Sequence, residues 1–280
     1  MDIIDCHTHI FPPEIIAKRE YIITKDIRFA SIYKGSQERL IDVAGLVEYM
    51  EGNRITSCIA CGFPFMDSGL IKMSNDYVIE ASRQDNKIIP FVVFDLDRRG
   101  NPINELERCQ GNGATGIGEI GFYEKGMQKQ ELEWLDDAAY FAEKAGMPVI
   151  LHVNEQIGHT YNGKIPVDFI GLTDFINRHP LLKLVLAHLG GGICFYEFMP
   201  EIRHIFANVY YDIAATPFIY SEHIYRYIGM FLSDKVLFGT DYPLLGPKRY
   251  LKGIKDMEKE AKENIFHRNA RRFLGIDRLG

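Results

Sequence analysis

Two histidines at the end of an apolar segment are the first residues in the chain that could do chemistry. His7 and His9 follow the run DIIDC and are two positions apart. In a β-strand, side chains at positions i and i+2 lie on the same face, so both imidazoles could reach one ion. A pair of this kind also arises by chance in a chain with nine histidines, so its position in the fold decides its meaning.

Further polar residues stand where other apolar segments stop. They are Glu119 in GIGEIG, His152 at the end of VILH, His188 at the end of LVLAH and Asp241 after VLFGT. A single histidine in such a place is usually a core residue with a backbone hydrogen bond. A whole set of them at the same level of several strands indicates metal ligands instead. Imidazole and carboxylate groups are ligands of Zn²⁺ and of similar divalent ions such as Mn²⁺.

The elements that would position these residues are short β-rich segments that alternate with helical patterns, as in βαβ units around a parallel sheet. Strand candidates lie at residues 2–6, 57–63, 88–95, 114–120, 148–152, 183–188, 209–213 and 235–238. Helical patterns lie at residues 40–50, 75–84, 104–110, 129–145, 168–178, 195–206, 221–231 and 248–261. Eight strand–helix repeats predict an α/β fold of the closed (β/α)8 TIM-barrel type, because an open sheet more often has fewer strands. No linker divides the chain, so we expect one domain over residues 1–280.

Two connections are longer than the usual βα loop. Residues 11–39 follow the first strand and residues 153–167 follow the fifth. Both should project at the C-terminal mouth of the barrel, where such folds build binding sites. His159, Tyr161 and Asn162 lie in the second connection, where they could contact a substrate or simply be solvated.

The composition narrows the class of protein. The chain has 280 residues, of which 46% are hydrophobic and 25% charged, so it can bury a sizeable core. Its net charge of −6 argues against nucleic acid and against an anionic membrane surface as partners. No segment has the length of a membrane helix or the pattern of a signal peptide. Five scattered cysteines are typical of reduced thiols, so we expect a cytoplasmic protein.

Several other features are expected to be structural. Cys58 and Cys61 form a CxxC pair within a strand, where residues three apart face opposite sides, so they should be buried thiols. The glycines at 190–192 lack the spacing of a phosphate-binding loop and should allow a close backbone turn. Trp134 should pack between a helix and the barrel. The histidines in or beside helical patterns are given no role: His179, His204, His223 and His267.

Segments from the first strand to the last helix resemble the amidohydrolase superfamily, specifically its amidohydrolase-2 branch. That branch also contains proteins similar to aminocarboxymuconate-semialdehyde decarboxylase. The segments are DCHTHIFP (5–12), GIGEIGF (116–122), LHVNE (151–155), VLAHLGGG (185–192), LFGTDYPL (237–244) and NIFHRNARRFLGI (264–276). The ordered set is far more specific than any one segment.

The resemblance implies roles for the polar residues. It implies a metal held by His7, His9 and His152. Asp241 would lie near the metal and act on its water, and His188 would be a ligand or would polarise the substrate. Glu119 resembles the bridging ligand of TatD-type nucleases, which implies two ions per chain. A single ion with Glu119 beside its ligands is the alternative, and both stay open.

The first functional hypothesis is a metal-dependent hydrolase that uses metal-activated water on an amide, ester or lactone of a small molecule. Asp241 would take the proton of the water and His188 would stabilise the oxyanion. The alternative is a metal-dependent non-oxidative decarboxylase of an aromatic or unsaturated carboxylic acid. Such an enzyme should use an arginine or lysine to hold the carboxylate, and the candidates are Arg19, Arg28 and Lys164.

Two further hypotheses belong to other classes. A TatD-like phosphodiesterase agrees with Glu119 but not with the acidic charge balance. A catalytically silent barrel would have no reason to keep the convergent metal-type side chains. The expected partners are a small-molecule substrate and, as a homodimer, a second copy of the chain.

Overall fold

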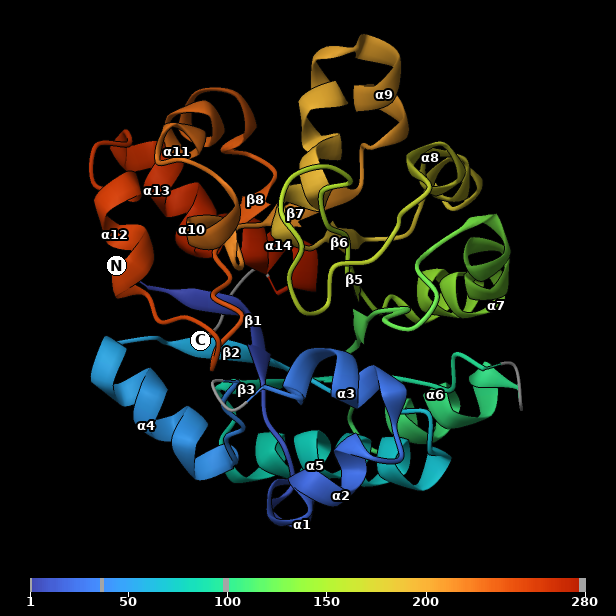
Figure 1. Ribbon diagram of the computed structural model, residues 1–280. Coiled ribbons are helices and arrows are strands. Elements are labelled where there is room, and N and C mark those ends of the chain that lie inside the picture. Colours follow the sequence, from blue (N-terminus) through green and yellow to red (C-terminus); the bar gives the residue numbers. More distant parts are fainter. Residues whose placement is uncertain (1, 36–37, 98–100, 277–280) are drawn as a thin grey trace.

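Eight parallel β-strands form one sheet, and neighbouring strands follow the order of the sequence (Figure 1). The computed structural model describes residues 2–35, 38–97 and 101–276. The strands are β1 (Ile4–His9), β2 (Ser57–Cys61), β3 (Ile88–Val92), β4 (Gly116–Ile120), β5 (Val149–Leu151), β6 (Leu184–Leu186), β7 (Val209–Asp212) and β8 (Val236–Leu237).

Backbone hydrogen bonds between the first strand and the segment after the last one bring the ends of the sheet together. The N–H of Cys6 donates to the carbonyl of Phe238 at 2.8 Å, and the N–H of His9 donates to that of Tyr242 at 2.8 Å. The N–H of Asp241 donates to the carbonyl of His7 at 2.9 Å. The sheet is therefore a nearly closed barrel, and the predicted (β/α)8 fold is confirmed.

Each strand lies within its predicted segment except the first. The prediction ended the first strand at residue 6, whereas β1 continues to His9. Histidines were taken as the end of the apolar run, but His7 and His9 are buried at the mouth of the barrel. The strand therefore continues past its apolar residues and includes buried polar residues of the barrel mouth.

Helices surround the strands, as Figure 1 shows. The α-helices are α1 (Pro13–Ala17), α2 (Arg19–Ile23), α3 (Ile27–Tyr33), α4 (Val43–Asn53), α5 (Ser68–Gln84), α6 (Pro102–Gly111), α7 (Lys129–Ala145), α8 (Phe169–Arg178), α9 (Pro200–Ile205), α10 (Thr216–Ile219), α11 (His223–Tyr227), α12 (Lys248–Ile254), α13 (Lys259–Glu263) and α14 (Asn269–Leu274). The 3₁₀ segment η1 (His188–Phe198) and the π-helical segments η2 (Ile228–Leu232) and η3 (Asn264–Arg268) complete the set. Side chains cap several of these helices, which explains where they begin: Asp42 caps α4, Asp67 caps α5, Asn101 caps α6 and Asp168 caps α8.

Several helical predictions were wrong in extent. Helix α5 begins at Ser68, not near residue 75, because Asp67 accepts from the N–H of Leu70. The pattern at 195–206 is divided, since Pro200 starts α9 and has no N–H to continue the preceding turn. The pattern at 248–261 is divided into α12 and α13. The connection 11–39, expected to be irregular, contains α1, α2 and α3.

The core has two parts separated by the sheet. The interior of the barrel holds apolar side chains from the strands, together with Ala270 and Phe273 of α14. The larger part lies between the sheet and the surrounding helices. Cys61 belongs to the interior and Cys58 to the outer part, so the two thiols face opposite sides as predicted. Trp134 packs against the outer part, also as predicted.

A buried arginine anchors the helical insertion between β1 and α4. Arg28 of α3 is fully buried, and its Nε donates to Oε2 of Glu124 at 2.7 Å. Its Nη2 donates to Oδ1 of Asp97 at 2.5 Å. These carboxylates follow β4 and β3, so the insertion is fixed against the C-terminal ends of two neighbouring strands.

The described part of the chain has no helix with both the length and the apolar character needed to span a membrane.

Candidate active site

The six polar residues predicted to converge do so at the C-terminal end of the barrel. His7 and His9 belong to β1 and Glu119 to β4. His152, His188 and Asp241 directly follow or lie shortly after β5, β6 and β8. Parallel strands carry these positions to the same edge of the sheet, because the strands all run in one direction.

One group of ligand-type atoms comes from the first and last strands. Nε2 of His7 lies 3.2 Å from Nε2 of His9. Oδ1 of Asp241 lies 3.3 Å from Nε2 of His9 and 3.7 Å from Nε2 of His7. The three side chains therefore present one atom each to a common point.

A second group comes from the middle strands. Oε1 of Glu119 lies 3.0 Å from Nδ1 of His152. That nitrogen lies 3.3 Å from Nε2 of His188, which is in turn 3.6 Å from Oε1 of Glu119. The ligand-type atoms of the group all lie within 4.8 Å of one another.

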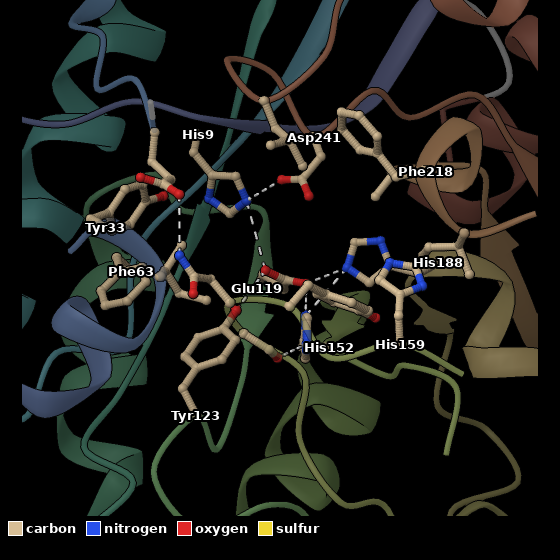
Figure 2. Close-up of a pocket in the computed structure, with 18 residues that line it drawn as sticks. His9, Tyr33, Phe63, Glu119, Tyr123, His152, His159, His188, Phe218 and Asp241 are labelled. Atoms are coloured by element: carbon tan, nitrogen blue, oxygen red, sulfur yellow. Dashed lines mark hydrogen bonds and ion pairs between the residues drawn. The ribbon is translucent and has the colours of Figure 1, made fainter. Parts of the chain in front are cut away.

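Glu119 lies between the two groups. Figure 2 shows its carboxylate with His9 and Asp241 on one side and with His152 and His188 on the other. Its Oε1 is 3.6 Å from Nε2 of His7, and its Oε2 is 3.7 Å from Nε2 of His9. A carboxylate has two oxygens and can contact two neighbouring sites at once.

Hydrogen bonds on the far side of three imidazoles fix which nitrogen faces the centre. Nδ1 of His7 donates to Oδ2 of Asp212 at 2.7 Å. Nδ1 of His188 lies 3.0 Å from the carbonyl oxygen of Ala214, and Nε2 of His152 lies 3.1 Å from that of Gly163. Each acceptor places a proton on the outer nitrogen, so the other nitrogen faces inward and is the one that a metal ion would bind.

Asp212 is a functional residue that the sequence reasoning missed. Besides His7, it holds the backbone of the connections after β6 and β7, because Oδ1 accepts from the N–H of His188 at 2.8 Å and from that of Ala214 at 3.1 Å. It is fully buried. The signal was present, since Asp212 is also a polar residue where an apolar strand stops.

Asp5 and Tyr123 also support the site without having been predicted. Oδ1 of Asp5 accepts from the backbone N–H of His7 and of Thr240, so it fixes the segments that carry His7 and Asp241. Burial raises the pKa of Asp5 to about 6, although hydrogen bonds from its neighbours lower it. The hydroxyl of Tyr123 donates to Oε2 of Glu119 at 2.9 Å.

The electrostatics of the cluster keep its carboxylates ionised. Burial raises the pKa of Glu119, but the neighbouring imidazoles of His7 and His152 outweigh it and hold that pKa well below its usual range. Burial likewise raises the pKa of Asp241, but His7, His9 and His188 lower it to about 2. The converse holds for His188, where burial lowers the pKa and the neighbouring carboxylates raise it to about 9.

This donor set fits a divalent metal. It consists of imidazole nitrogens that face inward and carboxylates that are ionised, and Zn²⁺ and Mn²⁺ bind both kinds of group once the inward nitrogens have lost their protons. The orienting hydrogen bonds are those that metal-binding histidines normally have. The candidate ligands are therefore His7, His9 and Asp241 in one group and Glu119, His152 and His188 in the other.

A cavity of about 490 Å³ opens above the cluster. It is reached by several of the ligand-type residues, Glu119 and Asp241 among them. Its apolar and aromatic lining comes from the connections after β1, β2, β4, β7 and β8: Ile32, Tyr33, Phe63, Tyr123, Ala215, Phe218, Ile219 and Leu244. Tyr33, Phe63 and Tyr123 touch in series, with ring centroids 5.6 Å and 5.8 Å apart.

The two long connections meet at this cavity. His159, Tyr161 and Asn162 all line it, which favours substrate contact over simple solvation. Nδ2 of Asn162 donates to Oε1 of Glu38 at 3.1 Å, which joins the fifth connection to the first.

The three cations proposed to hold a substrate carboxylate do not line the cavity, so that prediction was wrong. Each has acceptors elsewhere. Arg19 donates to the backbone carbonyls of Tyr33 and Glu38, and Arg28 is bound by the carboxylates of Asp97 and Glu124. Lys164 donates to Oε1 of Glu155 at 3.0 Å.

The glycine run forms the turn that the sequence predicted. Residues 188–192 all have positive φ, an arrangement that favours glycine. A Cβ at Gly191 would lie 2.1 Å from the carbonyl oxygen of Asn154, so the connections after β5 and β6 pack backbone to backbone.

Comparisons with known proteins found one similar curated sequence and several similar folds. A curated relative, 2-amino-3-carboxymuconate-6-semialdehyde decarboxylase of Dictyostelium discoideum, is 27% identical over 252 residues, which are 74% of this chain and 67% of the relative. The solved structure of 5-carboxyvanillate decarboxylase from Sphingomonas paucimobilis has a TM-score of 0.74 and 16% identity, covering 98% of this chain and 99% of the other. A 2,6-dihydroxybenzoate decarboxylase has a TM-score of 0.74 and 17% identity, with the same coverage.

At such low identities the solved structures show the fold alone. The family comes from a different comparison, because residues 4–276 match the family model Amidohydro_2, described as amidohydrolase. That match runs from the first strand to the last helix, and the protein is therefore an enzyme of the metal-dependent amidohydrolase-2 family.

Proposed function

We propose that the protein is a metal-dependent, non-oxidative decarboxylase of an aromatic or unsaturated carboxylic acid. The observation that carries this proposal is that one cavity has two kinds of lining. A histidine–carboxylate cluster forms one part of it, and aromatic side chains form its walls. The Dictyostelium relative is named as a decarboxylase of an unsaturated acid. This support favours decarboxylation over hydrolysis, which the sequence analysis placed first.

The reaction loses a charge, which suits such a cavity. The bond between the substrate carbon and its carboxylate breaks, the electron pair stays on that carbon, CO₂ leaves and a proton takes its place. A bound divalent ion supplies positive charge and oxygen affinity that hold a carboxylate at the cluster. The apolar walls exclude water, and they disfavour the charged acid relative to neutral CO₂.

Two residues of this chain are placed to handle the proton. Asp241 and His188 both line the cavity, and they lie on different sides of Glu119. The hydrogen bond from Nδ1 of His188 to the carbonyl oxygen of Ala214 leaves Nε2 facing the cluster. We assign proton transfer to this pair, in which Asp241 is the group nearer to His9.

The metal content is part of the proposal. The two groups of ligand-type atoms, with the Glu119 carboxylate between them, support two ions per chain, and the donor set suits zinc or manganese. Metal analysis of the purified protein should then give a ratio near two, and Glu119→Gln should lower it to one. A ratio of one in the unchanged protein would contradict a bridging role for Glu119 between two ions.

The activity is tested by incubating the metal-loaded protein with aromatic and unsaturated acids in D₂O. We expect release of CO₂ and a product that carries one deuterium at the carbon that lost the carboxylate. The His7→Ala/His9→Ala double variant is the control, because it removes two candidate ligands. Hydrolysis of amides, esters or lactones without any CO₂ release would overturn the proposal in favour of a hydrolase.

A further inference from the structure

Tyr123 belongs both to the aromatic wall of the cavity and to the surroundings of the metal-type cluster. Its ring lines the cavity, and its hydroxyl donates to Oε2 of Glu119 at 2.9 Å. Figure 2 shows the side chain reaching from the wall to that carboxylate, which lies between the two groups of ligand-type atoms. Tyr123 itself belongs to neither group. Its polar end therefore acts on a candidate ligand and not on an ion.

The two oxygens of Glu119 have different neighbours. Oε1 lies 3.0 Å from Nδ1 of His152 and 3.6 Å from Nε2 of His188, so it faces one ligand group. Oε2 lies 3.7 Å from Nε2 of His9, which belongs to the other group. The terminal torsion of a glutamate has broad energy wells, so an unrestrained carboxylate turns easily. Such a turn would withdraw the oxygens from these positions, and the directional hydrogen bond from Tyr123 to Oε2 opposes it.

The ring of Tyr123 is itself fixed on three sides. It lies parallel to the ring of Phe63, with centroids 5.8 Å apart and an interplanar angle of 6°. It meets the imidazole of His152 at 4.9 Å and 62°. On the third side is Gly121, where a Cβ would lie 2.4 Å from Cζ and 2.8 Å from the hydroxyl oxygen of Tyr123. The lack of a side chain at Gly121 is what allows the ring to fold back onto Glu119.

From this geometry we infer that Tyr123 is a positioning residue, whose hydroxyl holds Glu119 with one oxygen toward each ligand group so that one carboxylate can bridge two ions. The inference rests on the two-ion centre of the proposed function, but not on decarboxylation itself. Hydrogen bonds to the carboxylates that bind a metal contribute to its affinity, and their loss weakens binding by about 10-fold to 100-fold. Tyr123 therefore determines how tightly the second ion is held.

The test is the binding of Mn²⁺ to Tyr123→Phe, which removes the hydroxyl and keeps the ring. Calorimetric titration should show that the first ion binds with the affinity of the unchanged protein, which also shows that the variant is folded. The affinity for the second ion should fall by about 10-fold to 100-fold. Two Mn²⁺ ions that share a carboxylate are magnetically coupled, so electron paramagnetic resonance distinguishes the pair from single ions. The signal of the pair should be absent from Tyr123→Phe at an Mn²⁺ concentration that saturates the unchanged protein.

Tyr33→Phe is the matched control. Tyr33 belongs to the same series of rings, 5.6 Å from Phe63, but in the described part of the chain its hydroxyl does not bond to Glu119. This variant should bind both ions as the unchanged protein does. Gly121→Ala approaches the same contact from the other side, because its methyl group would displace the ring of Tyr123. It should reproduce the loss of the second ion although the hydroxyl is still in the chain.

Three results would overturn the inference. They are unchanged affinity for both ions in Tyr123→Phe, an equal loss in Tyr33→Phe, and a single bound ion in the unchanged protein. Release of CO₂ by the unchanged protein is measured separately. If no acid releases CO₂ but Tyr123→Phe loses the second ion, the decarboxylase proposal fails and the role of Tyr123 stands. If CO₂ is released but Tyr123→Phe keeps both ions, the role of Tyr123 fails and the decarboxylase stands.

Discussion

Three imidazoles of the site owe their orientation to acceptors that lie outside it. Asp212 is the most important of these acceptors, because it accepts from Nδ1 of His7 and also from the N–H groups of His188 and Ala214. A carboxylate in this place fixes the ring and makes the inward nitrogen a better ligand. Its loss should therefore affect metal binding before it affects any later step.

We expect Asp212→Asn to weaken metal binding by about 10-fold to 100-fold. The measurement is competition with a chelator of known affinity, followed by the metal that stays on the protein. Asp174→Asn on the exposed face of α8 is the control, because it removes a carboxylate far from the cluster. An unchanged metal affinity in Asp212→Asn would show that His7 keeps its orientation without this partner.

We expect Asp241 to matter more for proton transfer than for metal binding. Asp241→Asn keeps one oxygen near His9 and should leave most of the metal bound, yet lower turnover by at least about 100-fold, the scale of a lost acid–base group. Metal content and kcat are measured on the same sample. Turnover equal to that of the unchanged protein would remove Asp241 from the chemistry.

The position of residues at strand ends predicted which side chains would meet, but not how they would be grouped. His7, Glu119 and Asp241 were recognised because each interrupts an apolar run. The division into two groups depends on side-chain directions within the barrel, and the sequence does not contain those. Asp212, the last residue of β7, was passed over because it lay inside the predicted strand 209–213.

At the scale of elements, the connection after β6 has the most demanding geometry. Residues 188–192 have left-handed backbone, and Gly191 packs against the backbone of Asn154 and Glu155. This contact sets the direction in which His188 leaves β6. The turn is therefore part of the site as well as of the fold.

Gly191→Ala should destabilise the protein by about 2 to 4 kcal/mol, because the new Cβ meets backbone that cannot move away easily. Thermal unfolding of the metal-free protein provides the measurement. Gly52→Ala in α4 is the control, since nothing lies within 4 Å of its Cβ, and it should be neutral or slightly stabilising. Equal melting temperatures for the two variants would contradict the close contact.

Helices could be predicted from the sequence where the spacing of apolar residues and the residue that ends the helix were both clear. Helix α7 matches its predicted residues, since its apolar positions recur at helical spacing and Gly146 ends it. Helices α1 to α3 were missed because residues 11–39 were read only as an unusually long connection. These short helices are held by tertiary contacts such as those of Arg28, which no local pattern indicates.

At the scale of the whole molecule, eight strand–helix repeats were enough to predict the barrel and the edge at which the site would lie. The cavity was not predictable, because its lining comes from connections whose paths depend on packing. Arg19, Arg28 and Lys164 show the difference. Each lies in a connection at the mouth, yet none lines the cavity, and each donates to acceptors of its own connection or of a neighbouring one.

The metal should stabilise the whole barrel, because its candidate ligands come from strands β1 and β4 and from the segments after β5, β6 and β8. An ion that binds only the folded state adds about 2.7 kcal/mol at a free concentration one hundred times its Kd. Removal of metal by a chelator should therefore lower Tm by several degrees, and Mn²⁺ or Zn²⁺ should restore it. The His7→Ala/His9→Ala variant should show a much smaller shift, whereas His204→Ala on the outer helix α9 should respond like the unchanged protein. If Tm were insensitive to metal in the unchanged protein, the convergent side chains would not be a metal site.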